Sequence, residues 1–221
     1  MPSVAILTLP EFNEVDSFVA YHMLNRSSEV DAFLAGPEPE VVSFFGTRVH
    51  IDHSLEDALK ADAVIVGSGR LTRKFAASND FLTALKFRPD DQIVASQCSG
   101  ALILAKLGLL QGLPVCTDNM TRPWIEEMGL TVLDKTLAVE GNIATAGGCL
   151  GAQQLAAWIL CRLVGEAAAR DALAYVAPIG DGDDFIDRLI AAAKQADRGL
   201  QKKLTVLQPT AGRQSARGVA D

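Results

Sequence analysis

The chain has 221 residues, of which 49% are hydrophobic and 21% are charged, so it can bury one large core. Its formal net charge is −7 and its basic residues are scattered, which argues against a nucleic-acid partner. The apolar runs are too short to span a bilayer, and the N-terminus lacks the basic segment of a signal peptide. We therefore expect a cytoplasmic protein with no membrane partner.

Short apolar runs alternate with helical patterns from the first residues onward. This alternation is typical of β-α-β units and predicts an α/β fold with a mostly parallel sheet. In the first half of the chain we expect strands at 4–9, 31–35, 63–66 and 93–97, a hairpin joining 41–45 to 49–51, and helices at 14–25, 55–59 and 71–87.

The second half continues the alternation and ends on helices. We expect one domain over residues 1–197 and a polar tail over 198–221 that is too short for a further domain. The expected elements are helices at 99–107, 122–128, 147–164, 166–175 and 183–196, a short strand at 114–117, and a hairpin joining 131–139 to 142–145.

The most distinctive segment runs from Ile93 to Leu104, where a buried-strand pattern ends at Cys98 and a helix of small residues begins at once. This order is typical of a nucleophile elbow. The partial positive charge of the helix N-terminus predicts a lowered thiol pKa. Ser99 could cap the helix or bond to the sulfur, and Gly100 would let helix and strand approach closely. The alternative is that Cys98 is a buried structural thiol.

Gly67-Ser68-Gly69 follows a neighbouring strand of the expected sheet. Turns at the carboxyl ends of neighbouring parallel strands meet over one crevice, so the Ser68 and Gly69 amides could face Cys98. Such amides would stabilise negative charge that develops on a substrate atom. An ordinary turn is the alternative interpretation.

Three acidic residues, Glu11, Glu14 and Asp16, follow the first strand at the start of the first helix. One of these carboxyls could meet the sulfur, in which case its pKa should rise and its proton should be shared with the thiol. Taken singly, each residue could instead simply complement the helix N-terminus.

The four cysteines and three histidines show no zinc-ligand spacing, so we expect no metal site and also no cofactor. The cysteines lie far apart in apolar surroundings, which suits reduced thiols better than disulfides. Cys161 is expected to be a core thiol.

The elbow segment Ser96-Gln97-Cys98-Ser99-Gly100-Ala101 and several other segments along the chain resemble the ThiJ/PfpI superfamily, and within it the isocyanide hydratase branch. The resemblance implies a single-domain, three-layer α/β/α sandwich of the flavodoxin-like, class I glutamine amidotransferase-like type. It also implies that Asp16 is the carboxyl beside the nucleophile, and that the protein is a homodimer. The matching segments are Leu9-Pro10-Glu11-Phe12 with Val15-Asp16, Ser96-Gln97-Cys98-Ser99-Gly100-Ala101, Gly108-Leu109-Leu110-Gln111-Gly112, Gly147-Gly148, and Tyr175-Val176-Ala177-Pro178.

The chain departs from that pattern at several positions. Relatives place a histidine shortly after the strand that follows the elbow helix, whereas here Asp118 follows Thr117 and no histidine comes after His53. A Cys–His pair is thus unavailable unless Asp118 or a partner chain substitutes. Gly67-Ser68-Gly69 stands where relatives tend to have Pro-Gly-Gly. Cys149 replaces an aliphatic residue, which suggests packing or a second accessible thiol.

The preferred hypothesis is a cysteine-dependent hydratase that acts on a small molecule such as an isocyanide. Cys98 would form a thioimidate, Asp16 would move the proton, and Ser99 with the amides near Ser68 and Gly69 would hold the developing charge. One alternative is glyoxalase-like or deglycase-like chemistry on methylglyoxal or its adducts. Another is a non-catalytic oxidant sensor or ligand-binding domain.

Overall fold

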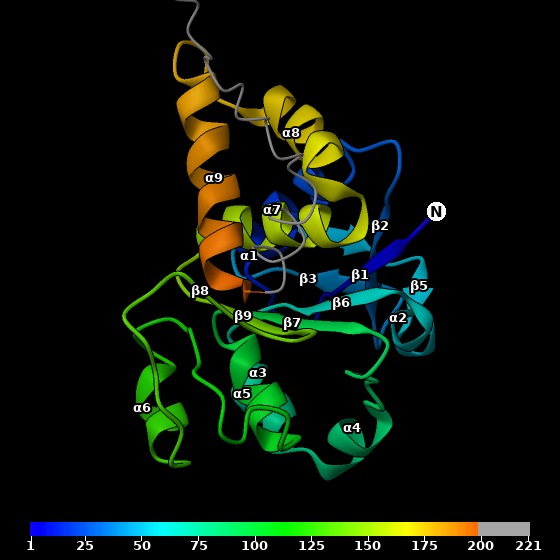
Figure 1. Cartoon of the computed structure of the whole chain (residues 1–221). Helices are drawn as coiled ribbons and strands as arrows, with labels where there is room; N and C mark the ends of the chain where they lie inside the picture. The colour runs from blue at the N-terminus through cyan, green and yellow to red at the C-terminus, as the bar shows by residue number, and fades with distance from the viewer. Residues whose placement is uncertain (199–221) are drawn as a thin grey trace, which may run out of the picture.

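The centre of the computed structural model, which describes residues 1–198, is a seven-stranded sheet between two layers of helices (Figure 1). The strand order is β5-β2-β1-β6-β7-β9-β8, and all neighbours run parallel except β8 and β9. The strands are β1 (Ser3–Leu7), β2 (Asp31–Gly36), β5 (His53–Ser54), β6 (Ala63–Val66), β7 (Ile93–Gln97), β8 (Leu137–Glu140) and β9 (Ile143–Ala146).

Helices cover both faces of the sheet, as Figure 1 shows. The first face carries α1 (Glu14–Leu24), α7 (Gly151–Leu163), α8 (Gly165–Val176) and α9 (Gly182–Ala196). The second face carries α2 (Leu55–Lys60), α3 (Thr72–Ala76), α4 (Asn79–Ala84), α5 (Gly100–Lys106) and α6 (Arg122–Glu126).

Successive side chains of the central strands enter different cores. In β1, Val4 and Ile6 belong to the core that α1 and α7 cover, whereas Ala5 and Leu7 belong to the core that α2 and α5 cover. This follows from the two-residue side-chain period of a strand, and it explains why strands buried on both faces are apolar throughout. The expected single-domain, three-layer α/β/α sandwich is confirmed.

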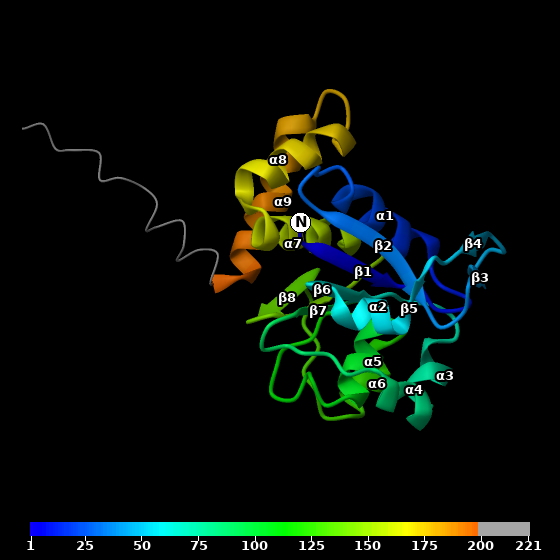
Figure 2. The ribbon, with the colours of Figure 1, turned by 90° about the vertical axis from the view of Figure 1, so that its right-hand side faces the viewer.

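A separate hairpin of β3 (Glu40–Val42) and β4 (Arg48–His50) projects beyond the main sheet (Figure 2). It was expected from the turn at Gly46, whose φ of 92° suits glycine. In the part of the chain that the structure describes, no helix is long and apolar enough to cross a membrane.

The single helix expected over 71–87 is wrong, because α3 and α4 divide this segment. The Ser78 hydroxyl accepts a hydrogen bond from the Phe81 backbone N–H at 3.3 Å and so begins a new helix. Serine side chains compete with helix continuation in this way. The helical spacing of apolar residues continues across the break, so the sequence pattern predicts one helix where the structure has two.

The strand expected at 114–117 is also wrong, since the structure has only an isolated parallel bridge between Val115 and Val132. The next backbone N–H, that of Cys116, donates instead to the Thr145 hydroxyl at 2.8 Å. A side-chain hydroxyl thus takes the place of the backbone carbonyl that a neighbouring strand would offer. The hairpin strand expected at 131–139 is also shorter in the structure, where it is β8. Apart from residue 198, the expected tail lies outside the described residues.

Candidate active site

The turns after four neighbouring parallel strands converge at one edge of the sheet. These strands are β1, β6, β7 and β9, and the segments that follow them contribute Asp16, Ser68, Cys98 and Cys149 respectively. An Asp16 carboxylate oxygen and the sulfurs of Cys98 and Cys149 all lie within 4.8 Å of one another. Carboxyl ends of parallel strands are where open α/β sheets form their sites, so the position is the expected one.

Cys98 is held in a strained turn between β7 and α5. Its φ of 46° is unusual for a non-glycine residue. The Cys98 N–H donates to the Ala146 carbonyl at 2.8 Å, and the Cys98 carbonyl accepts from the Thr117 hydroxyl at 2.8 Å. A Cβ on Gly100 would lie 2.2 Å from the Val66 carbonyl oxygen, so only glycine fits there. These contacts fix the elbow.

Asp16 lies in the first turn of α1, where Asn13 fixes the helix start. The Asn13 side-chain oxygen accepts from the Val15 N–H at 3.0 Å, as an N-cap does. Asp16 is 1% exposed, and its Oδ2 accepts a hydrogen bond from the Ser68 hydroxyl. Its Oδ1 accepts no well-aligned hydrogen bond from the described residues, so this atom is available to the thiols.

The Asp16 carboxyl and the Cys98 thiol both have raised pKa values. Burial raises the pKa of Asp16, although polar contacts from Ser68, Cys98 and Cys149 oppose the shift. Burial, followed by the neighbouring Asp16 charge, raises the pKa of Cys98 far above that of a free thiol. A negative charge on either group opposes ionisation of the other, so the two groups titrate as a coupled pair.

The expectation that the helix N-terminus lowers the pKa of the Cys98 thiol is wrong. The side chain is 4% exposed, and α5 has only seven residues. Desolvation of a buried thiolate is a larger effect than the dipole of a two-turn helix.

The Ser99 hydroxyl neither caps α5 nor bonds to the sulfur, contrary to expectation. It donates to the Thr72 hydroxyl at 3.0 Å and accepts from the Gly69 N–H at 3.3 Å. The Gly69 amide is thus already in use. The backbone N–H groups of Ser68 and Ser99 have no hydrogen-bond acceptor within residues 1–198, so they can serve a ligand.

The other two acidic candidates near the first helix point elsewhere. Glu11 pairs with Arg70 at 2.9 Å, and the Glu14 carboxylate accepts from the Ser43 hydroxyl and from the Phe45 N–H at 2.9 Å. Both residues anchor neighbouring loops. Asp16 is the member of this group that lies beside Cys98.

Asp118 acts as a cap for the turn that leads into α6. Its Oδ1 accepts from the N–H groups of Met120 and Thr121 at 2.9 and 3.0 Å, and its Oδ2 accepts from the Thr121 hydroxyl at 2.7 Å. Its charge still reaches the pair and adds to the raised pKa values of Asp16 and Cys98. The histidines of the chain have partners elsewhere: His22 near Tyr175, His50 near Asp52, and His53 near Phe33.

Cys149, for which the sequence left packing and a second accessible thiol as alternatives, lies beside Asp16 and Cys98. It is half-buried, and the Asn13 side-chain N–H donates to its sulfur at 3.3 Å. Sequence reasoning did not single out Asn13, although its place three residues before Asp16 at a helix start is a recognisable capping signal. The site therefore contains two thiols.

The Asp16, Cys98 and Cys149 side chains could together hold a metal ion. Two thiolates and a carboxylate are ligand types that zinc accepts. No sequence spacing predicts this set, because each of the three residues comes from a different turn.

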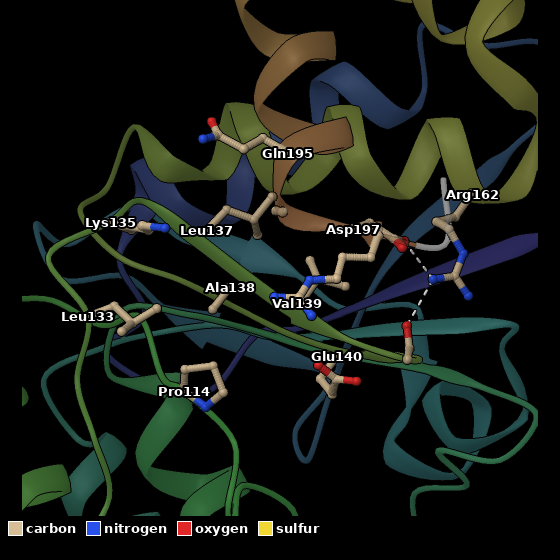
Figure 3. A pocket seen from close by; sticks show the side chains of 13 residues that line it. Pro114, Leu133, Lys135, Leu137, Ala138, Val139, Glu140, Arg162, Gln195 and Asp197 are labelled. Carbon is tan, nitrogen blue, oxygen red and sulfur yellow. Dashed lines mark hydrogen bonds and ion pairs between the residues drawn. The ribbon is translucent and has the colours of Figure 1, made fainter. Parts of the chain in front are cut away.

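A cavity of about 610 Å³ lies away from this cluster, between β8 and the end of α9 (Figure 3). Figure 3 shows Arg162 at its margin, donating to the Asp197 carboxylate at 2.9 Å and to the Gly141 carbonyl at 2.8 Å. Neither Cys98 nor Asp16 lines this cavity, so it is separate from the cysteine site.

Comparison with known proteins finds one matching family and one curated relative. The model of the DJ-1/PfpI family matches residues 2–161. An isonitrile hydratase from Pseudomonas putida is 23% identical over 164 residues, which cover 73% of this chain and 72% of that enzyme.

Solved structures have the same fold. Schizosaccharomyces pombe DJ-1 superposes with a TM-score of 0.68 at 16% identity, covering 77% of this chain and 96% of that one. A ThiJ/PfpI family protein from Pseudomonas syringae gives a TM-score of 0.72 at 18% identity, with 89% of each chain covered. At such identities the likeness shows the fold alone.

Proposed function

Because the chain belongs to the DJ-1/PfpI family, we propose that it is a cysteine-dependent hydratase that converts a small isocyanide into an N-substituted formamide. The observation that carries this proposal is the buried Asp16–Cys98 pair, whose proximity and raised pKa values support one proton shared between the two groups. The likeness to an isonitrile hydratase supports the choice of substrate class.

In the first step, a nucleophile must attack the isocyanide carbon and a proton donor must then protonate the same carbon. Cys98 gives its proton to Asp16 Oδ1 as its sulfur bonds to the isocyanide carbon. That carbon becomes basic, and Asp16 returns the proton to it. The product is a thioimidate in which carbon carries the Cys98 sulfur, a hydrogen and the substrate nitrogen.

Water releases the product in the second step. Asp16 Oδ1 accepts one proton from water as the water oxygen bonds to the thioimidate carbon, and it then passes this proton to the substrate nitrogen. The free N–H groups of Ser68 and Ser99 stabilise charge on the new oxygen. The carbon–sulfur bond then breaks as the carbonyl forms, and the proton still on the new oxygen passes through Asp16 to the Cys98 sulfur. The net reaction adds one water to the isocyanide and gives the formamide.

The Ser68 hydroxyl positions the carboxyl for both steps. By donating to Oδ2, it holds Asp16 so that Oδ1 is left for the sulfur and the substrate. Asp118 is engaged by Met120 and Thr121, so it is poorly placed to act as a histidine-like base. The set of groups suits hydration of a small electrophile better than amide hydrolysis.

The test is formamide production from cyclohexyl isocyanide and from a small aryl isocyanide, followed by chromatography. Wild-type protein should form the N-substituted formamide, and Cys98→Ala should fall to the buffer background. Cys161→Ala is the matched control, because Cys161 is a buried thiol in α7 outside the site, and it should keep the activity.

Absence of formamide above the Cys98→Ala background would reject the hydratase. Lactate formed from methylglyoxal by the same samples would instead favour the glyoxalase-like alternative.

A further inference from the structure

Two thiols from different turns lie at one buried carboxyl, and the hydration chemistry uses only one of them. We propose that Cys149 is a resolving thiol for Cys98, and that a hydroperoxide converts the two into a reversible intramolecular disulfide. This inference is independent of the isocyanide reaction, because it concerns the oxidation state of the sulfurs.

The sulfurs are held near each other by the sheet itself. Strands β7 and β9 are neighbours with Gln97 opposite Ala146, so the turns that carry Cys98 and Cys149 leave the sheet side by side. The Gln97 side-chain amide then links the two turns by donating to the carbonyls of Gly148 at 2.9 Å and Cys149 at 3.4 Å. The same amide group lies 3.7 Å from the Cys98 sulfur.

Each sulfur also has a neighbour suited to its part in the reaction. The two sulfurs lie no more than 4.8 Å apart, and Asp16 lies beside both. Rotation of the two side chains must bring them to a bond length of about 2 Å. Asn13 donates to the Cys149 sulfur at 3.3 Å and so holds this side chain beside Cys98 and Asp16. The remaining cysteines, Cys116 and Cys161, lie in the core away from this cluster.

Exposure separates the roles of the two thiols. Cys98 is buried, so only a small oxidant reaches it, whereas Cys149 is half-buried and therefore more accessible to a reductant. A resolving cysteine next to an oxidisable thiol is the arrangement that redox-sensitive sites use.

The proposed reaction balances in two steps. In the first, Cys98 passes its proton to Asp16, and its sulfur attacks the peroxide oxygen. The O–O bond breaks, the leaving oxygen takes the proton from Asp16, and Cys98 becomes a sulfenic acid. In the second, the Cys149 sulfur attacks the Cys98 sulfur, and the hydroxyl leaves as water with the Cys149 proton. Two thiols are oxidised by two electrons in total, and one hydroperoxide is reduced.

The disulfide would have two consequences. It would occupy the Cys98 nucleophile until a thiol reductant restored it. It would also stop Cys98 from proceeding to sulfinic acid, which thiol reductants do not reverse.

The experiment treats the full chain, after incubation with a chelator, with hydrogen peroxide and then with iodoacetamide. Free thiols should fall from four to two per chain, and unreduced peptide mapping should show Cys98 joined to Cys149. Dithiothreitol should restore all four thiols, and a non-reducing gel should show no disulfide-linked dimer. In Cys149→Ala, peroxide should drive Cys98 to sulfinic acid that dithiothreitol does not recover, whereas Cys161→Ala should behave as wild type.

Wild-type peptide mapping alone can overturn the inference, even if a variant fails to fold. Cys98 sulfinic acid beside an unoxidised Cys149, a bridge to Cys116 or Cys161, a bridge between chains, or an unreactive Cys98 would each contradict it. None of these outcomes depends on whether the protein hydrates isocyanides, so the two proposals fail separately.

Discussion

Burial is the main influence on the chemistry of Cys98. A thiol in this position has little water to stabilise its anion, and the neighbouring Asp16 is also acidic. In the proposed chemistry, the Cys98 thiol therefore stays protonated until a substrate arrives and then needs Asp16 to take its proton. Such a site would favour small uncharged electrophiles, because a large or charged molecule could not enter or be solvated there.

At Asp16, we predict that stability and activity change in opposite directions. Asp16→Asn keeps a group that can accept from Ser68 and removes a buried carboxyl whose Oδ1 lacks a well-aligned hydrogen-bond donor. We expect the free energy of unfolding at pH 7 to rise by about 1 kcal/mol, at the low end of the cost of an unsatisfied buried polar group. Formamide production should fall by roughly 10²- to 10⁴-fold, the usual contribution of a general acid–base group.

Urea titration and the formamide assay measure these two effects. A variant that is both less stable and inactive would mean that Asp16 is a structural residue. An active Asp16→Asn would exclude it as the proton carrier.

At the scale of elements, the close contact between α5 and β6 depends on Gly100. A methyl group there would lie 2.2 Å from the Val66 carbonyl oxygen and 2.9 Å from that of Gly67, so backbone must move. We predict that Gly100→Ala lowers the free energy of unfolding by about 3 kcal/mol or more, as overpacking against rigid groups does.

The matched control is Gly182→Ala in the first turn of α9, where the nearest atom, Ala177 Cβ, would lie 3.8 Å away. This change should be neutral or stabilising by up to about 1 kcal/mol. Thermal or urea unfolding of both variants decides the matter, and equal stabilities would contradict the proposed packing role of Gly100.

Elements with strong local signals could be predicted from the sequence, and elements that depend on particular side-chain bonds could not. The elbow at Cys98 was recognisable because a β-branched strand, a small-residue turn and an apolar helix follow each other directly. The division between α3 and α4 was missed because the apolar period runs through it, while the Ser78 cap decides the break. Similarly, the Thr145 hydroxyl replaces a strand partner at Cys116.

At the scale of the whole molecule, parallel topology explains the site. Asp16, Ser68 and Cys98 follow strands that β-α-β connections make parallel, so their meeting could be expected. Cys149 follows β9, which comes from a hairpin, and no local signal says that this hairpin places β9 parallel to β7. The sequence therefore does not predict that Cys149 lies beside Cys98, although cysteine is a residue type that redox and metal chemistry use.

A homodimer is the assembly that the family resemblance leads us to propose. Light scattering during size-exclusion chromatography should then give twice the chain mass of 23.5 kDa. A single-chain mass that persists at high protein concentration would contradict this proposal.

The most direct test of the account is the pH dependence of Cys98 alkylation by iodoacetamide, followed by peptide mapping in wild type and Asp16→Asn. The Asp16 charge raises the pKa of the Cys98 thiol, so its removal should move the alkylation profile to lower pH, while wild type should titrate above the ordinary thiol value of 9.0. Superimposable profiles in the two proteins, or a wild-type thiol that titrates below 9.0, would contradict the shared proton on which the proposed chemistry rests.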